Sequence, residues 1–201
     1  TWVPLLTVDE HTGVNEFVVH ADKPDLIVAS TYQRRRHVWT LINGGPGSGI
    51  HRSADGGKTW EKATSGLPSD HMGRIGLGAA PSEPSLIYAI IEANDKEKGV
   101  YRTTDFGQSW EKRSGRITTS PQYYNELIVD PLEPNRLYSL DTFSAVSEDG
   151  GKTFTRLSAA HRHVDDHALW IDPNNTAHLL MGGDGGVYES WDRGQKWRHM
   201  D

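Results

Sequence analysis

A pattern of eight residues that occurs four times constrains the fold of this chain more than any other feature. Each copy has a hydroxyl residue, an aspartate two positions later, a glycine two positions after that and an aromatic residue three positions further on. The copies occupy residues 53–60, 103–110, 147–154 and 190–197, and their aspartates are 50, 44 and 43 residues apart. Such a period indicates a repeat architecture, in which one supersecondary unit is copied along the chain.

Each repeat also contains four short segments that we predict to be strands. Two largely apolar runs flank a turn, a third short run enters the eight-residue pattern, and a fourth leaves it through the aromatic residue. The first runs are 16–19, 74–78, 126–129 and 168–171, and the second runs are 26–29, 86–90, 137–140 and 178–181. Four antiparallel strands in one repeat of this length form one blade of a β-propeller.

The composition agrees with an all-β chain and excludes several functional classes. The 201 residues include 21 glycines and 10 prolines, which suits many short strands joined by turns. No apolar run is long enough to cross a bilayer, so we expect no membrane span. The net charge of −6 argues against a nucleic-acid partner, whose binding surface should be basic. Without cysteine there is neither a disulfide nor a thiol nucleophile, and the compartment cannot be read from redox chemistry.

We therefore predict one propeller segment over residues 1–201, with blades at 12–64, 73–114, 123–157 and 166–201. Residues 1–6 match the sequence that closes and follows the first pattern, 59–64, so we expect them to form the outer strand of a preceding blade. A closed propeller needs whole blades, and this strand would be a surplus. We accordingly expect the segment to belong to a larger propeller, whose remaining blades come from the same or a neighbouring chain.

The repeated pattern itself has a structural explanation. Glycine supplies the positive φ of a tight hairpin turn, aspartate accepts hydrogen bonds from the backbone of that turn, and the closing aromatic side chain packs between sheets. We expect these roles, without a ligand, for Asp55, Trp60, Asp105, Trp110, Asp149, Phe154, Asp192 and Trp197.

The pattern resembles the Asp-box, or BNR repeat, of sialidases, xyloglucanase-type glycoside hydrolases and sortilin-like receptors. The resemblance implies a β-propeller whose boxes lie at the periphery, away from the ligand face. Residues 32–39, 73–78 and 163–167 give a looser resemblance to large secreted bacterial BNR proteins that are described as glycosyl hydrolase-like or sortilin-like. That second resemblance implies an extracellular or periplasmic protein.

Strand direction predicts which loops share a face with a ligand. Successive strands reverse, so the loops between second and third strands lie at the same end as the connections between blades, opposite the boxes. From the turn proline to the box aspartate the distance is 31 residues after Pro24 and 21 after Pro84, against 15 after Pro134. The first two repeats therefore carry insertions at this end, and long loops on a rigid scaffold are common places for binding residues.

The first insertion contains Arg34, Arg35, Arg36 and Trp39, which are candidates for binding carboxylates, sulfates or sugar faces. The alternative is a solvated basic loop that pairs with local acids. Other residues on the connections at the same end extend the set of ligand-binding candidates, namely His71, Arg74, Tyr124, His163 and His167.

Residues 161–167 form a second unusual stretch, with three histidines and two aspartates in seven positions. Such groups bind divalent metals or transfer protons, and the candidate metal ligands are His161, His163, Asp165 and His167. The spacing matches no standard zinc pattern, and alternate residues of a strand face opposite ways. A hydrogen-bonded cluster is therefore the favoured interpretation, and we expect no cofactor.

These features favour a ligand-binding module for a polysaccharide or a peptide. The alternative is part of a glycoside hydrolase, in which two carboxylates face each other across a sugar. The candidates for that chemistry are Asp165 or Asp166 opposite Asp70 or Glu10. A sialidase is disfavoured, because the Phe/Tyr-Arg-Ile-Pro signature of that family is missing, and residues 73–76 come nearest to it.

Overall fold

The computed structural model describes residues 2–200 and contains strands, turns and loops without a helix in that range. The prediction of an all-β chain is confirmed. No helix of the described chain is long and apolar enough to cross a membrane. The strands form four separate antiparallel sheets, in which they pair in chain order apart from one extra strand of the first sheet.

The first sheet has an extra strand, and the other three have four strands each. The first sheet comprises β1 (Thr12–Val19), β2 (Ile27–His37), β4 (Gly49–Ser53) and β5 (Glu61–Lys62), while β3 (Thr40–Asn43) pairs with the far end of β2. The second comprises β6 (Ile75–Ala79), β7 (Ile87–Ile91), β8 (Gly99–Thr103) and β9 (Glu111–Ser114). The third comprises β10 (Glu126–Val129), β11 (Leu137–Leu140), β12 (Ala145–Ser147) and β13 (Thr155–Arg156). The fourth comprises β14 (Asp166–Ile171), β15 (Leu179–Gly183), β16 (Gly186–Ser190) and β17 (Arg198–His199).

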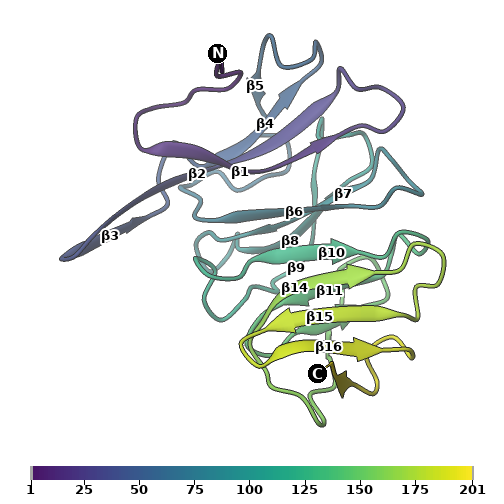
Figure 1. The fold of residues 1–201 in the computed structure, drawn as a ribbon. Coiled ribbons are helices and arrows are strands. Elements are labelled where there is room, and N and C mark those ends of the chain that lie inside the picture. Colours follow the sequence, from purple (N-terminus) through teal and green to yellow (C-terminus); the bar gives the residue numbers. More distant parts are fainter. Residues whose placement is uncertain (1, 201) are drawn as a thin grey trace.

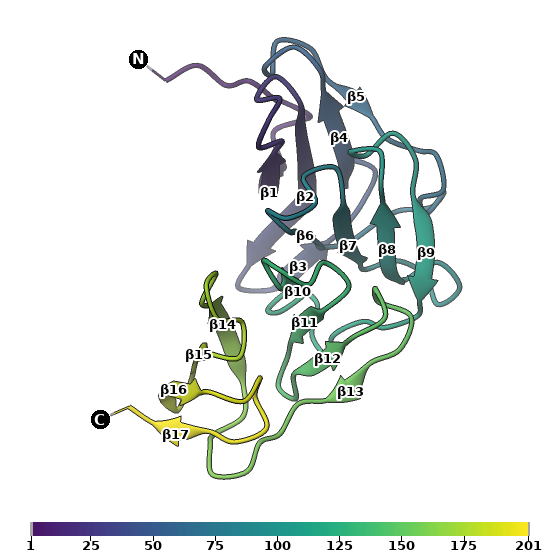
Figure 2. The same ribbon diagram turned by 90° about the vertical axis from the view of Figure 1, so that its right-hand side faces the viewer.

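The sheets stand next to one another along an open arc, as blades of a propeller do (Figure 2). Their first strands, β1, β6, β10 and β14, lie toward the inside of the arc, and β5, β9 and β13 lie on its outside. Each first strand pairs with the next strand of its own sheet, and β6 also contacts β1 and β10 of the neighbouring blades.

Each pair of neighbouring blades shares its own apolar core. The first core joins blades one and two, the second joins blades two and three, and the third joins blades three and four. The aromatic residues that close the second, third and fourth boxes enter these cores: Trp110 lies in the first, Phe154 packs against the second, and Trp197 lies in the third. The boxes therefore stabilise the contacts between blades as well as their own turns.

The boxes themselves are nearly identical in their hydrogen bonds. In the third box, the Asp149 carboxylate accepts bonds from the backbone N–H of Thr153 at 2.9 Å, from the Thr153 hydroxyl at 2.7 Å and from the Ser147 hydroxyl at 2.8 Å. The Ser147 hydroxyl oxygen in turn accepts the N–H of Gly151 at 2.9 Å. The fourth box has the corresponding bonds around Asp192. Lys196 stands at the position of Thr153, so the bond from the hydroxyl group of that residue to the aspartate is missing there.

Two segments differ from the predicted arrangement. Residues 2–6 form no strand, although the sequence predicts an outer strand over 1–6; residue 1 lies outside the described residues. A strand needs a neighbouring edge with which to exchange hydrogen bonds, and no described strand is paired with this segment. Leu5 lies instead against the first box, beside Gly57 and Trp60.

The insertion in the first repeat forms a β-hairpin instead of an irregular loop. β2 continues through the three arginines to His37, turns, and pairs with β3 from Thr40 to Asn43. Figure 1 shows this hairpin extending well beyond the sheets, at the end where β14 begins and β15 ends. We call that end of the blades the rim.

Candidate functional site

The protruding hairpin at the rim presents exposed charged and aromatic side chains. Arg35 pairs with Ile42 across the two strands, and its Nε donates a hydrogen bond to Nε2 of His37 at 2.7 Å. The His37 ring stacks on Trp39, with 5.3 Å between centroids and 6° between planes. Arg34 and Arg36 occupy the positions on either side of Arg35, so their side chains point to the opposite face of the hairpin.

A row of polar contacts continues from this hairpin into the second and third blades. Asn43 Nδ2 donates to Glu92 Oε1 at 2.9 Å, and Glu92 Oε2 accepts the backbone N–H of Arg74 at 3.0 Å. The Arg74 guanidinium reaches across to the third blade, where Nη1 donates to the carbonyl of Gln122 at 3.2 Å and Nη2 pairs with Glu126 at 3.3 Å. Polar side chains of three blades are thus joined at one end of the arc, and those of the second and third blades are charged.

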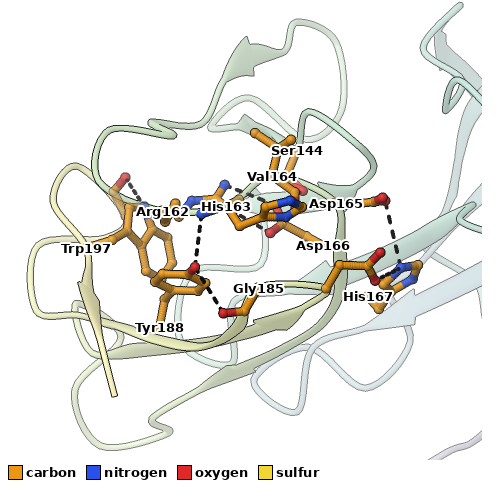
Figure 3. A network of polar contacts seen from close by, with 12 residues as sticks. Ser144, Arg162, His163, Val164, Asp165, Asp166, His167, Gly185, Tyr188 and Trp197 are labelled. Carbon is orange, nitrogen blue, oxygen red and sulfur yellow. Dashed lines mark hydrogen bonds and ion pairs between the residues drawn. The ribbon is translucent and has the colours of Figure 1, made fainter. Parts of the chain in front are cut away.

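The row ends in the fourth blade at a cluster around His167. The Tyr124 hydroxyl donates a hydrogen bond to Asp165, and the Tyr124 ring stacks on the His167 ring at 5.3 Å and 14°. His167 Nε2 lies 3.8 Å from Asp165 Oδ1 and 3.4 Å from Asp184 Oδ1. Figure 3 shows the side chains of Asp165 and His167 next to each other on the rim side of the network. We call Asn43, Glu92, Arg74, Glu126, His167, Asp165, Asp184 and Tyr124 the rim row.

Two glutamates at the rim hold their protons unusually strongly. Burial raises the pKa of Glu16, on β1, to about 7, although the backbone N–H of Leu77 bonds to its carboxylate and works against the shift. Burial also raises the pKa of Glu126, which the neighbouring Arg74 lowers in part. A carboxyl group that titrates near neutral pH can donate as well as accept a proton.

A cleft of about 320 Å³ opens beside the row, between the hairpin and the second blade. It is lined by Asn43, Glu92 and the exposed His71, and by backbone at Gly44 and Gly73. A Cβ atom on Gly44 would lie 2.7 Å from the carbonyl oxygen of Met72, and Gly44 has φ of +102°. A side chain at Gly44 would thus collide with the wall of the cleft and strain its backbone.

Several predicted residues occupy other surroundings. Asp166 has a side chain only 2 % exposed, and it is held by the Arg162 guanidinium and the Ser144 hydroxyl, so it cannot contact a substrate at the surface (Figure 3). The backbone N–H of His163 bonds to the Tyr188 hydroxyl. Asp70 is exposed and bonds the N–H of its neighbour His71. The donor atoms that converge in the described residues belong to Asp165, His167 and Asp184, without His161 or His163.

Four acidic residues of the site were not among the sequence-based candidates: Glu16, Glu92, Glu126 and Asp184. Glu16 and Glu126 each begin an otherwise apolar run, and an acidic residue in such a run was the available signal. Asp184 lies in the Gly-rich stretch 182–186. The glycines predict a tight turn, and a carboxylate in a tight turn is expected to be exposed.

A known sequence repeat matches two of the four boxes. The family model for the BNR/Asp-box repeat matches residues 51–62 and 101–112, which are the first two boxes. Among curated proteins, no sequence matches the chain.

Solved structures share the fold at low sequence identity. A GH74 enzyme from Niastella koreensis is 19 % identical over 92 % of this chain and 24 % of its own, with a TM-score of 0.58. An ancestral GH74 enzyme is 14 % identical over 96 % of this chain and 25 % of its own, with a TM-score of 0.62. The YCF48 protein bound to D1 peptide is 12 % identical over 96 % of this chain and 83 % of its own, with a TM-score of 0.52. The chain thus spans about a quarter of the length of the GH74 enzymes, and the similarity concerns the fold.

Proposed function

We propose that this chain, a β-propeller segment built from BNR/Asp-box repeats, is a ligand-binding module of an extracellular or periplasmic protein. The observation that supports the proposal is the rim row, which brings together Asn43 of the first blade and charged side chains of the other three blades, beside a cleft and an exposed hairpin. The boxes, in contrast, use their polar groups to bond their own turns. The rim therefore offers polar groups that a ligand can reach.

The chemistry of the rim suits a polysaccharide. Sugar hydroxyls donate to carboxylates and accept from guanidinium and imidazole groups, and the rim row offers all three kinds of group. The exposed rings of Trp39 and Tyr123 offer apolar faces on which sugar rings can stack. An extended peptide is the second ligand class, because its backbone presents the same donors and acceptors, and a propeller of similar fold, YCF48, has been solved with a bound peptide.

A binding experiment with matched variants tests this proposal. Soluble plant and algal polysaccharides and a peptide array are applied to the full chain, and the ligand that binds is titrated by calorimetry. We expect Glu126→Gln and Trp39→Ala each to weaken binding about tenfold, because each removes one contact worth about 1.4 kcal/mol. The control is Glu111→Gln, which removes a carboxylate that pairs with Arg102 and Arg113 on the outer strand of the second blade. Equal affinity of the rim variants and the control would refute the assignment.

A glycoside hydrolase is the second candidate, favoured by the raised pKa of Glu16 and of Glu126. The general acid of a glycosidase must hold a proton near neutral pH, and burial provides that condition here. Release of reducing ends from the polysaccharide that binds would support this function, provided that Glu16→Gln and Glu126→Gln abolish it. Binding without turnover would leave the module function alone.

The first sheet has an exposed apolar face that a further blade could cover. Phe17 and Val19 of the first sheet are exposed and line an apolar cleft of about 520 Å³ with Trp60. The equivalent positions of the third sheet, Leu127 and Val129, are buried against the second blade. We propose that a preceding blade of the same or a neighbouring chain covers Phe17 and Val19 in the same way.

A further inference from the structure

The fourth blade contains two histidines that each lie between two carboxylates, and the two arrangements differ. In the first, Nδ1 of His178 lies 3.6 Å from Asp172 and Nε2 lies 3.1 Å from Glu189. The carboxylates approach opposite nitrogens of the ring, so the imidazole bridges them and no single ion can contact all three groups. The His178 ring also stacks on Trp191 at 3.7 Å and 4°. The contacts of His178 are therefore explained by hydrogen bonding and ring stacking within the fourth blade.

In the second arrangement, both carboxylates approach the same nitrogen. Asp165 Oδ1 and Asp184 Oδ1 lie 3.8 and 3.4 Å from Nε2 of His167, and the donor atoms of the three residues are all within 4.8 Å of one another. Both separations exceed the roughly 2.7–3.2 Å of N–H···O hydrogen bonds. A ring nitrogen carries at most one hydrogen, so it cannot satisfy two carboxylates at once. The three groups converge on one point for which hydrogen bonding among them gives no reason.

The two separations from His167 are close to those between the ligands of a small divalent cation. Zn²⁺ binds imidazole nitrogen and carboxylate oxygen at about 2.0–2.2 Å in a tetrahedron, which places neighbouring ligand atoms roughly 3.3–3.6 Å apart. The two distances from His167 Nε2 lie at or just outside this range. Ca²⁺ is a poorer match, because it takes six to eight oxygen ligands at about 2.3–2.6 Å.

The backbone positions these ligands. Asp165 has φ of +80°, an unusual conformation for a residue with a side chain, and it immediately precedes β14. The turn that carries Asp184 approaches this residue closely, because a Cβ atom on Gly183 would lie 2.3 Å from the Asp165 carbonyl oxygen. A side chain at position 183 would collide with the Asp165 backbone, so glycine permits this close approach of the two segments.

Tyr124 of the third blade fixes two of the three ligands from outside. Its hydroxyl bonds Asp165, and its ring lies against that of His167. Partners of this kind orient the ligands of metal sites and limit their rotation.

We propose that Asp165, His167 and Asp184 bind a divalent transition-metal cation, with Zn²⁺ as the best match. The side chains are 29 %, 45 % and 60 % exposed, so the remaining coordination position faces solvent and is open to water or to an oxygen atom of a ligand. The proposal concerns the cation alone and holds whichever ligand the rim binds.

Calorimetric titration of the chelator-treated full chain with ZnCl₂ tests the site. We expect one Zn²⁺ per chain, with an affinity that falls at least tenfold in His167→Gln and in Asp184→Asn. His178→Gln is the matched control, because it removes the other histidine between two carboxylates, and it should leave the affinity unchanged. CaCl₂ should give no comparable binding.

A second readout separates this site from the other histidines, since the chain has ten. Co²⁺ in place of Zn²⁺ should give the visible absorption of a tetrahedral site in the wild-type chain and in His178→Gln, but not in His167→Gln. Circular dichroism of each variant confirms that it is folded, and Asp172→Asn replaces His178→Gln if the latter is not. Zn²⁺ binding that is absent, or equal in His167→Gln, Asp184→Asn and the control, would overturn the proposal.

Discussion

The two ends of each blade place carboxyl groups in opposite environments. At the box end, hydrogen bonds from Thr59 lower the pKa of Asp55 to about 2, and bonds from Thr153 lower the pKa of Asp149 to about 2. At the rim, burial raises the pKa of Glu16 to about 7 and also raises that of Glu126. Ionised carboxylates therefore stabilise the folded chain at the box end, whereas at the rim the ionisation of these carboxyl groups destabilises it. Groups kept at such a cost are common at functional sites.

Aromatic side chains show the same contrast. Trp110 in the second box is 6 % exposed and belongs to the core between the first two blades. Trp39 at the tip of the rim hairpin is 81 % exposed and contacts the His37 ring. Trp110 packs between two blades, whereas Trp39 is available to a ligand. The two residues should therefore differ in how much they contribute to the free energy of unfolding.

The largest effect that we expect comes from Trp110→Ala. Removal of a buried tryptophan costs about 3–5 kcal/mol of unfolding free energy, because the lost contacts leave a cavity between the blades. Trp39→Ala should change the unfolding free energy by less than about 0.5 kcal/mol, as exposed substitutions do. Guanidinium denaturation followed by far-ultraviolet circular dichroism measures both variants. Similar losses in the two would contradict the contrast between box and rim.

The contrast also explains how far the sequence could predict this structure. The box is a local pattern in which Ser147, Asp149 and Gly151 bond one another within a few residues, so the spacing of the pattern was sufficient to predict the hairpins and, from their period, the blades. The confirmed fold class rests on this locality. The segment before Thr7 shows the limit, because its pairing depends on a neighbour and not on its own sequence.

The rim was less predictable, since its contacts join residues far apart in the chain. Glu92 and Asn43 are 49 residues apart, and Arg74 and Glu126 are 52 apart. Strand direction correctly grouped the loops at one end, but it could not tell that Asp165 faces the rim while Asp166 is buried. Alternation along a strand predicts that the two side chains face opposite ways, but not which of them is buried, and a turn with positive φ at Asp165 precedes the strand. Local sequence gives no measure of such a turn.

A smaller effect is expected at the third box, in acid. Because the folded-state pKa of Asp149 lies below its ordinary value, its ionised carboxylate contributes stability above about pH 4, and this contribution is lost as the pH falls toward 2. Asp149→Asn should cost about 1 kcal/mol at pH 7, as loss of a turn cap does, and less as the pH approaches 2. Thermal denaturation between pH 2 and 7 measures this dependence. A cost that does not change with pH would contradict the role of the charge.

An effect of similar size is expected at Glu16, with the opposite dependence on pH. Its pKa is raised in the folded state, so the unfolded chain loses this proton first, and stability should fall as the pH rises from about 4.5 to 7. Glu16→Gln removes the buried charge and keeps a carbonyl oxygen to accept the N–H of Leu77. The variant should be more stable than the wild-type chain by about 1 kcal/mol at pH 8, and no more stable at pH 4.

Denaturation at the two pH values, with Glu61→Gln as an exposed control in the same sheet, tests this prediction. A loss of stability in Glu16→Gln at pH 8 would mean that the carboxylate is held there by favourable contacts, as the box aspartates are. The two ends of the blade would then treat acidic groups alike, and the raised pKa could no longer support a proton-transfer role at the rim. A gain that appears only above neutral pH would instead show that the first blade retains this glutamate at the expense of its own stability.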